Sequence, residues 1–511
     1  MKSEPNRYLW WPLYIFYTLL AFVVLRFGFS STGLCMHWRP DYDANIYHLI
    51  GRGWMEGIRP YVQLSDLKGP LVFLQCGLGS LISPNSFLGA SLLQAPVVGL
   101  GLLYACKCAS LFVGRGWGLV ASGLLFIYVW YFGVNPSATV LTMQYISLYH
   151  VLKCLVRGES LGRWPVYAMG LFVGLVLLIK FNLAAFWVPL VLYTLMCKEW
   201  WRQAGLLLAG LATVLLPVCV GLAWAGLLTA CWQEYVLTAV RYGSSGVEHS
   251  ALVQSGWELL AEMLPEHLYK KGSLILKAVC GGVQLFLWLL LPRLVRVLCV
   301  RAYYMVLGGS FLLSLVAIFG GQYHYSHYYF SFLPFVLLSL VCAVRVFQRS
   351  WEWPRQGVFA GGLGVLLSVL LALLSALLAV YVKEYRPHNG VAAICHSSQS
   401  LVRCLQGNTF VCTDPSACLH LYRLTGTTPP IRHFVPQMVP HGQQKHHQEL
   451  LKCIQNNQAR YLVCTMVQKN HTEKLIRESG IPYRRILLTS PDFPPYPPLT
   501  AYTPFCLYER L

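Results

Sequence analysis

The stretch that decides the fold is Asp41-Tyr-Asp43-Ala-Asn45-Ile-Tyr47-His48, which leads on to Asp66-Leu-Lys68-Gly69-Pro70. It lies between two apolar runs, residues 9–29 and 87–106. Since a membrane-spanning helix needs about 20 mostly apolar residues, both runs are candidate spans. The polar stretch between them is therefore expected to form a loop at one face of a bilayer.

The composition of the whole chain also indicates a membrane protein. Of its 511 residues 56% are hydrophobic and 12% are charged, whereas soluble domains carry about 25% charged residues. The mean hydropathy of +0.52 agrees, and these values exclude a disordered, collagen-like or coiled-coil chain. A net charge of +19 is compatible with nucleic-acid binding. However, most Lys and Arg residues stand singly or in small groups between apolar runs, so we expect no nucleic-acid partner.

The charges between the apolar runs predict how the chain crosses the membrane. Further candidate spans lie at 117–134, 138–152, 165–181, 183–197, 204–228, 273–292, 303–320, 327–344 and 357–381. A shorter run at 70–84 is ambiguous, at about 14 residues. If it lies flat on the membrane, the basic loops all fall on one side, which the positive-inside rule makes cytoplasmic. We therefore expect about eleven spans plus a membrane-surface helix at 70–84.

This orientation places three segments on the outer face: the loop 30–86, the loop 229–272 and everything after about residue 382. In the last segment, strand-like runs at Thr409–Cys412 and Arg460–Cys464 alternate with helical stretches at Gln443–Asn456 and Glu473–Ser479. The predicted fold class is a polytopic α-helical membrane protein with a small C-terminal α/β domain. We expect a transmembrane domain over 1–384 and an extracytoplasmic domain over 385–511.

Cofactor motifs are missing from the sequence. Of 18 cysteines, none forms a CxxC pair or a Cys/His cluster with zinc spacing, so we expect no metal site. The sequence carries no Rossmann or P-loop glycine pattern either, which argues against a nucleotide-sugar or ATP site. The first apolar run has no small-residue cleavage site after it and is interpreted as a span rather than a signal peptide. No cofactor is predicted.

The first outer loop admits two interpretations. Asp41 or Asp43 can cap a helix that ends near Gly57 and Pro60, with Asp43 and Tyr47 on one face, four residues apart. A capping aspartate on a helix at the membrane surface would need no further function. A transferase also needs a carboxylate that accepts a proton from a hydroxyl group and a cation that neutralises a leaving phosphate. The residues alone leave both interpretations open.

The order of residues resembles a known family. Asp43-x-x-x-Tyr47, then Gly57-x-x-Pro60-Tyr61, then Asp66-x-Lys68-Gly69-Pro70 is similar to the first outer loop of GT-C glycosyltransferases that use polyprenyl-phosphate sugars. Relatives are the dolichyl-phosphate-mannose protein mannosyltransferases and the lipid A aminoarabinose transferases. The resemblance extends more weakly to residues 170–182, 323–329 and the tail. It implies an inverting, metal-independent transferase on the outer face of a bacterial inner membrane, with a polyprenyl-phosphate-linked sugar as donor and a glycan, lipid or protein as acceptor.

The resemblance also implies residue roles. It makes Asp43 the base, with Asp41 as the fallback, and Lys68 the contact to the donor phosphate. Further phosphate contacts are predicted at Lys180 and His327, and acceptor or substrate contacts at Tyr47, Tyr61, Asp66 and Asn135. Snorkelling would also explain Lys180, and an interfacial aromatic belt with a structural histidine would explain the surroundings of His327.

One position departs from the family pattern. Many relatives carry a second carboxylate just after the third span, where this chain has Asn135-Pro136-Ser137. Asn135 or Ser137 could substitute through hydrogen bonding, the acceptor site could differ, or activity could be reduced. An inactive lipid-binding relative therefore stays an alternative. A transporter or flippase is another, although such proteins place ionisable residues inside their spans and often have inverted repeats, which are not visible here.

The topology makes a direct prediction. Reporter fusions after Arg349 and after Glu384 should report opposite sides of the membrane, because one span separates these positions. A fusion near Lys107 should report the cytoplasm. If both C-terminal fusions report the cytoplasm, or if Lys107 is external, segment 70–84 does not lie flat.

Overall fold

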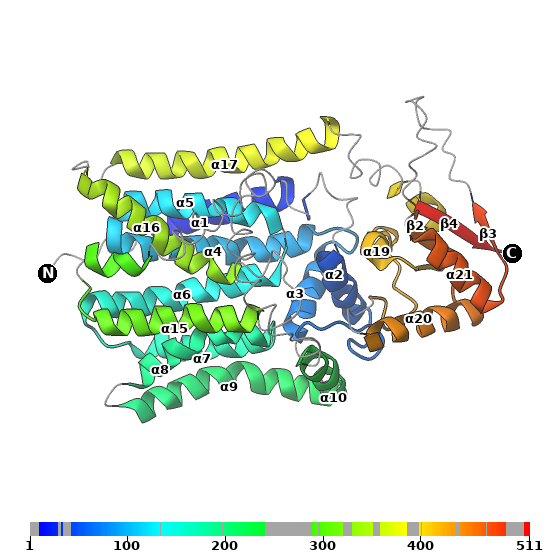
Figure 1. Cartoon of the computed structure of the whole chain (residues 1–511), viewed down its shortest axis with the longest axis horizontal. Helices are drawn as coiled ribbons and strands as arrows, with labels where there is room; N and C mark the ends of the chain where they lie inside the picture. Colours follow the sequence, from blue (N-terminus) through cyan, green and yellow to red (C-terminus); the bar gives the residue numbers. More distant parts are fainter. Residues whose placement is uncertain are drawn as a thin grey trace. The chain divides into compact units, whose positions relative to one another are not determined.

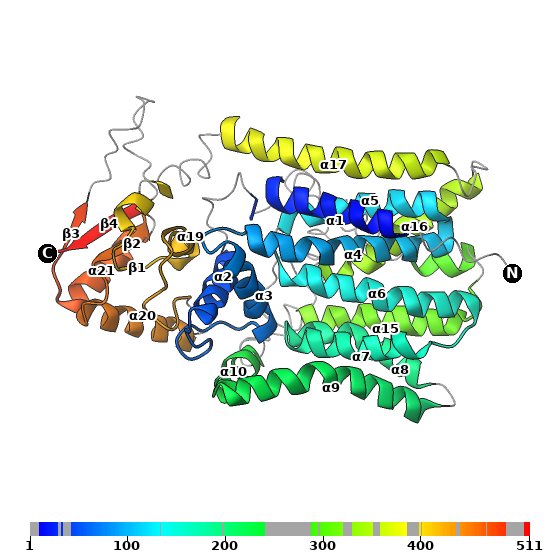
Figure 2. The same ribbon diagram turned by 180° about the vertical axis from the view of Figure 1, so that it is seen from behind.

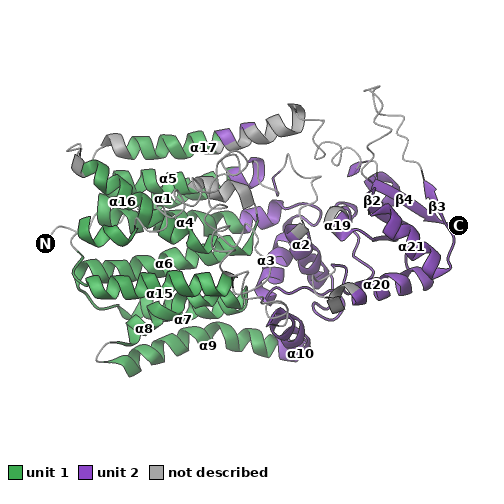
Figure 3. Ribbon diagram, in the orientation of Figure 1, with its two compact units in different colours: residues 1–23, 94–221, 243–373 green, residues 24–93, 222–242, 374–511 purple. Residues whose placement is uncertain are grey.

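The computed structural model describes residues 10–28, 32–33, 42–132, 134–196, 199–240, 288–294, 297–319, 330–350, 358–385, 398–399, 401–435, 440–466, 468–486 and 505–511. Asp41, His327 and most of the predicted span 273–292 lie outside these residues. The chain forms two compact units (Figure 3). Unit 1 comprises residues 1–23, 94–221 and 243–373, and unit 2 comprises 24–93, 222–242 and 374–511.

Unit 1 is built from long apolar helices that run side by side (Figures 1 and 2). The helices are α1 (Trp10–Phe27), α4 (Leu88–Val113), α5 (Arg115–Phe132), α6 (Pro136–Arg157), α7 (Arg163–Leu177), the 3₁₀ helix η3 (Phe181–Trp187), α8 (Val188–Leu195), α9 (Trp200–Trp224), α15 (Val300–Phe319), α16 (Leu333–Ser350) and α17 (Val358–Tyr385). The ends of α1, α4, α9 and α17 continue into unit 2. Five of the described helices are long and apolar enough to cross a membrane. The predicted helical architecture with several candidate spans is confirmed, and the number of about eleven spans stays a prediction.

Glycines let the helices of unit 1 approach closely. A Cβ atom on Gly170 of α7 would lie 2.0 Å from the Leu207 carbonyl oxygen, and one on Gly210 of α9 would lie 2.1 Å from the Tyr167 carbonyl oxygen. Small residues at helix contacts are typical of membrane helices, whose association depends on tight packing. Elsewhere along α9, large apolar side chains such as Leu216 and Trp224 are exposed, as expected of a helix that faces lipid.

Unit 2 contains the first loop, which folds into α2 (Tyr42–Met55) and α3 (Pro70–Ile82). The helix predicted over 70–84 is therefore confirmed as a helix, while its flat orientation on the membrane stays a prediction. The two helices meet at glycines, because a Cβ atom on Gly51 would lie 2.4 Å from the Phe73 carbonyl oxygen and 2.5 Å from the Gly77 nitrogen. Gly57, with φ +88°, follows α2 in the left-handed conformation that glycine favours.

The tail of unit 2 forms a four-stranded sheet with the order β1-β2-β4-β3. Its strands are β1 (Phe410–Cys412), β2 (Tyr461–Thr465), β3 (Tyr483–Ile486) and β4 (Phe505–Arg510), and its helices are α19 (Pro415–Thr425), α20 (Pro440–Gln455) and α21 (Lys469–Ser479). β1 and β2 are parallel, and β4 is antiparallel to both β2 and β3. The sheet contains both predicted strands, whereas β3 and β4 were not predicted. The boundary at residues 384/385 stays a prediction.

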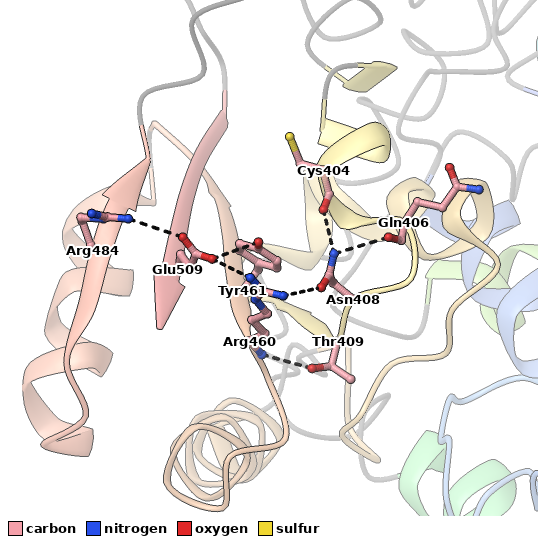
Figure 4. A network of polar contacts seen from close by, with 8 residues as sticks. All are labelled: Cys404, Gln406, Asn408, Thr409, Arg460, Tyr461, Arg484 and Glu509. Carbon is pink, nitrogen blue, oxygen red and sulfur yellow. Dashed lines mark hydrogen bonds and ion pairs between the residues drawn. The ribbon is translucent and has the colours of Figure 1, made fainter. Parts of the chain in front are cut away.

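A polar network joins one end of this sheet (Figure 4). Glu509 of β4 accepts hydrogen bonds from the Arg460 guanidinium at 3.0 Å and from the Tyr461 hydroxyl at 3.1 Å, and Arg484 of β3 lies 3.7 Å away. Arg460 also donates to Asn408 Oδ1 at 3.0 Å. These contacts accompany the register in which β4 pairs with β2 and β3. Because the two arginines are exposed, the ion pairs are expected to add little to stability.

The glycine contact between α2 and α3 can be tested by substitution. Gly51→Ala should lower the thermal unfolding midpoint of the detergent-solubilised protein, because the new methyl group meets backbone atoms that cannot move aside. Overpacking of this kind costs roughly 1–3 kcal/mol. Gly53→Ala is the matched control, since its Cβ atom would meet the Ile58 side chain at 3.3 Å, which can shift. Equal midpoints for the two variants would contradict the close approach.

Candidate active site

The helix α2 brings Asp43 and Tyr47 to one face. Asp43 lies in the first turn of α2 and is half-buried, and Tyr47 lies one turn later and is buried. The Lys68 ammonium lies 5.6 Å from the centre of the Tyr47 ring, a distance at which a cation is attracted to an aromatic face. The helix agrees with the prediction that Asp43 and Tyr47 share one face. The fold also places Lys68, another predicted residue, beside Tyr47.

Asp66 interacts electrostatically with Asp43, near the start of the first loop, and with Lys68, near its end. Its carboxylate accepts hydrogen bonds from the backbone N–H groups of Leu67 and Lys68. Burial raises the pKa of Asp66 above its ordinary value, the Lys68 charge opposes this shift, and the charge of Asp43 adds to it. Two carboxylates and one ammonium group thus act on one another within this loop.

Tyr61 holds the loop in shape. It is fully buried and has a φ of +65°, a conformation that a non-glycine residue adopts only when its surroundings enforce it. Its hydroxyl donates to the Lys68 carbonyl oxygen at 2.8 Å, and its backbone N–H donates to the Leu64 carbonyl oxygen at 2.7 Å. The ring centre lies 5.6 Å from that of Phe73. Tyr61 therefore fixes the backbone beside Lys68, and its contact with an acceptor stays a prediction.

Four of the predicted residues lie elsewhere in the chain or are not described by the structure. Lys180 and Asn135 belong to unit 1, whereas Asp41 and His327 lie outside the described residues. Lys180 is half-buried and extended, at the break between α7 and η3. Asn135 caps α6, because its Oδ1 accepts from the Ser137 backbone N–H at 2.8 Å. The fold thus gathers Asp43, Tyr47, Tyr61, Asp66 and Lys68 in unit 2.

Arg423 of α19 is a buried residue that sequence analysis did not assign. Its Nε donates to Asn45 Oδ1 at 2.8 Å and its Nη1 to the Asn85 carbonyl oxygen at 3.0 Å. Its guanidinium carbon lies 4.5 Å from the centre of the Phe87 ring. Asn45 is two residues from Asp43, so the tail holds the helix that carries the predicted base. The 378 residues that separate Arg423 from Asn45 leave no local sequence signal for this contact.

His48 of α2 is a structural residue. Burial, together with the charges of Arg423 and Arg52, lowers the pKa of His48 to about 3. The imidazole is therefore neutral, and its Nε2–H donates to the Pro84 carbonyl oxygen at 2.7 Å. On the same helix Arg52 donates to the Thr427 carbonyl oxygen and lies 3.4 Å from Glu56. The hydrogen bond to Thr427 also ties α2 to the tail of unit 2.

Comparison with known proteins and solved structures identifies the fold of the chain. No protein-family model matches the chain. No curated protein matches its sequence. Two crystal structures of ArnT from Cupriavidus metallidurans, one bound to undecaprenyl phosphate and one in the apo state, are similar to it with TM-scores of 0.57 and 0.56. Each is 15% identical to this chain in sequence. The match covers 99% of this chain in both cases, and 99% of the ligand-bound and 98% of the apo ArnT chain.

The chain has the ArnT fold. ArnT is a lipid A aminoarabinose transferase of the GT-C superfamily, so the resemblance predicted from the first-loop motif is confirmed at the level of fold. Within the described part of the chain, no group of three or more His, Cys, Asp or Glu side chains could hold a metal ion. The chemistry available at the first loop is that of two carboxylates, an ammonium group and a tyrosine ring.

Proposed function

We propose that the chain is a membrane glycosyltransferase that moves a sugar from a polyprenyl-phosphate carrier to a lipid, glycan or protein acceptor. The observation that carries this proposal is the gathering of Asp43, Asp66 and Lys68 in the first loop of a chain with the ArnT fold. One of the ArnT structures is bound to undecaprenyl phosphate. A donor of this class presents a phosphate at the membrane surface, where the predicted topology places Lys68.

In the proposed reaction, an acceptor hydroxyl attacks the anomeric carbon of the sugar. Asp43 takes the proton of this hydroxyl as the new carbon–oxygen bond forms. The bond between the anomeric carbon and the phosphate oxygen breaks, and the polyprenyl phosphate leaves with the electron pair. Lys68 stabilises the charge that develops on this phosphate. The Tyr47 ring, beside the Lys68 ammonium, restricts where that cation can lie.

The remaining predicted residues have supporting roles in this proposal. Lys180 and His327 are further contacts to the donor phosphate, and Asp66 and Tyr61 contact the substrates or hold the loop. Asn135 stands where relatives carry a second carboxylate. Its Oδ1 is used as a helix cap and its backbone carbonyl accepts from Gln94 at 2.9 Å. Its amide nitrogen can donate to an acceptor oxygen but cannot take a proton, so we assign the base role to Asp43.

We place the reaction on the outer face of a bacterial inner membrane, with the tail of unit 2 outside the cytoplasm. The positive-inside rule supports this orientation. The proposed reaction needs no metal ion or cofactor, since Lys68 supplies the positive charge. Inversion at the anomeric carbon follows from a single displacement.

The base role predicts a specific loss. Asp43→Asn should lower sugar transfer from a radiolabelled polyprenyl-phosphate donor in proteoliposomes by roughly 10²–10⁴-fold, because a positioned general base is lost. The yield and thermal midpoint of the folded protein should change little, since Asp43 is only half-buried.

Glu199→Gln is the matched control, because Glu199 is an exposed carboxylate whose ion pair with Arg202 is also exposed. It should transfer sugar at the parental rate. Wild-type turnover by Asp43→Asn would refute the base role. If Asp41→Asn is inactive and Asp43→Asn is active, the role moves to Asp41.

The phosphate role of Lys68 can be separated from a structural one. Lys68→Met should weaken donor binding and slow transfer, whereas Lys68→Arg should retain part of both, because pairing with a partly desolvated phosphate is stronger than a pairing on an open surface. Simple pairing with Asp66 or lipid headgroups would be worth under about 1 kcal/mol. Lys474→Met, at an exposed lysine of α21, is the control. Parental rates for Lys68→Met across a range of donor concentrations would rule out the phosphate contact.

A further inference from the structure

A second group of charges in unit 2 centres on Glu234, in the π-helix η4 (Trp232–Leu237). The Glu234 carboxylate oxygen Oε1 lies 2.5 Å from Arg432 Nη2 and 3.9 Å from His433 Nε2. Glu234 and His433 are both buried. Single turns of π-helix are rare and often occur at functional sites. The group therefore joins the segment 222–242 to the tail through a largely desolvated carboxylate.

The same group reaches the first loop at Ser65. The Ser65 backbone N–H donates to the Arg432 carbonyl oxygen at 3.0 Å, and the Ser65 hydroxyl lies close to the Glu234 carboxylate. Ser65 is buried and directly precedes Asp66. Arg432 thus holds the loop with its backbone while Glu234 holds the Arg432 side chain.

A second carboxylate holds His433 from the other side. The His433 backbone N–H donates to Glu449 Oε2 at 2.7 Å, and His433 Nδ1 lies 2.6 Å from Glu449 Oε1. The His433 carbonyl oxygen accepts from His446 Nδ1 at 2.6 Å. Glu449 and His446 both belong to α20, so the Arg432–His433 segment is fixed to the tail before it meets the loop.

We propose that Glu234 is a positioning residue that, through Arg432 and His433, holds Ser65 and with it the Asp66–Lys68 segment in the geometry that sugar transfer needs. The inference rests on the proposed function. Asp66 and Lys68 follow Ser65 along the chain, and Tyr61 fixes the Lys68 carbonyl from the other side. With both ends of residues 61–68 held, the Lys68 ammonium is confined beside Tyr47. The tail then acts as part of the active site without touching a substrate.

The expected consequence is a loss of catalytic rate. Displacing a reacting group by about 1 Å can cost roughly 100-fold in rate. Glu234→Gln keeps the shape of the side chain and removes its charge, so Arg432 loses its ion pair and the hold on Ser65 weakens. We expect kcat for sugar transfer to fall by roughly 10–100-fold while the KM for the acceptor changes little. Glu234→Asp, which keeps the charge, should recover part of kcat.

A second readout is independent of activity. Hydrogen–deuterium exchange of peptides over residues 60–69 should become faster in Glu234→Gln, because the Ser65 amide loses its fixed acceptor. Glu199→Gln is the matched control. Glu199 forms an exposed ion pair with Arg202, at 3.0 Å, and belongs to unit 1. It should leave kcat and the exchange of 60–69 unchanged.

The pH dependence distinguishes this cluster from a simple packing role. Burial lowers the pKa of His433, but the hydrogen bonds to Glu234 and Glu449 outweigh burial and the Arg432 charge, so the pKa is raised above its ordinary value of 6.5. Burial would raise the pKa of Glu234, but His433 and Arg432 hold it below 4.5. The ion pairs of this cluster should therefore be strongest between pH 4.5 and pH 6.5, the ordinary pKa values of the two side chains. They should weaken as the pH rises through the folded pKa of His433. The protection of 60–69 against exchange, measured relative to the intrinsic exchange rate at each pH, should fall over that rise in the wild type, but not in His433→Gln.

The outcomes separate the two proposals. If Asp43→Asn is inactive and Glu234→Gln keeps full kcat, the positioning role is overturned and the proposed function stands. Unchanged exchange of 60–69 in Glu234→Gln overturns it as well, whether or not transfer is detected. Should Glu234→Gln fail to fold, Glu234→Asp and His433→Gln carry the test, and unaltered kcat together with unaltered exchange in both overturns it.

Discussion

Unit 2 depends on one buried cation. Arg423 has no exposed surface, so its guanidinium has lost its hydration and must be compensated by protein groups. The compensation comes from Asn45 and the Asn85 carbonyl, and from the face of the Phe87 ring. Because removing a partner of a buried charge is costly, α2 cannot move away from α19 without the loss of the hydrogen bond that Asn45 accepts from this cation. The orientation of α2, and hence of Asp43, is fixed by the tail.

A second constraint is the shape of the loop that follows α2. A left-handed tyrosine is unfavourable by itself, by roughly 1–3 kcal/mol, and persists only where the surroundings determine it. At Tyr61 the buried ring, its hydrogen bond to Lys68 and its backbone bond to Leu64 supply that determination. The loop is therefore a rigid element rather than a flexible connection. A rigid loop suits the proposed role of Lys68 at a donor phosphate, since preorganised charge does not have to reorient during reaction.

Asn135 stands where the resemblance to GT-C enzymes predicts a second carboxylate, and the structure shows what surrounds it. Asn135 precedes Pro136, which occupies the first turn of α6 where a backbone N–H is dispensable, and its Oδ1 satisfies the N–H of Ser137. Asparagine and aspartate cap helices about equally well. The cap alone thus does not require the loss of charge at this position. The buried surroundings, with the Gln94 amide donating to the Asn135 carbonyl, favour a neutral side chain.

Several features of this protein follow from its sequence alone. Apolar runs long enough to span a bilayer predict the helices of unit 1, since hydrophobicity over a window needs no tertiary information. The resemblance of the first loop to GT-C glycosyltransferases predicts the candidate site at Asp43, Tyr47 and Lys68, which the residues alone leave open. Short apolar runs between polar helical stretches predict β1 and β2. The sequence did not predict β4, because its six residues, Phe505–Arg510, form a stable strand only between β2 and β3. Nor did it reveal Arg423, Arg432, His433 or Glu234, whose contacts join residues up to 378 positions apart. Such contacts depend on how the chain folds back on itself, and only the tertiary structure decides which buried charges meet.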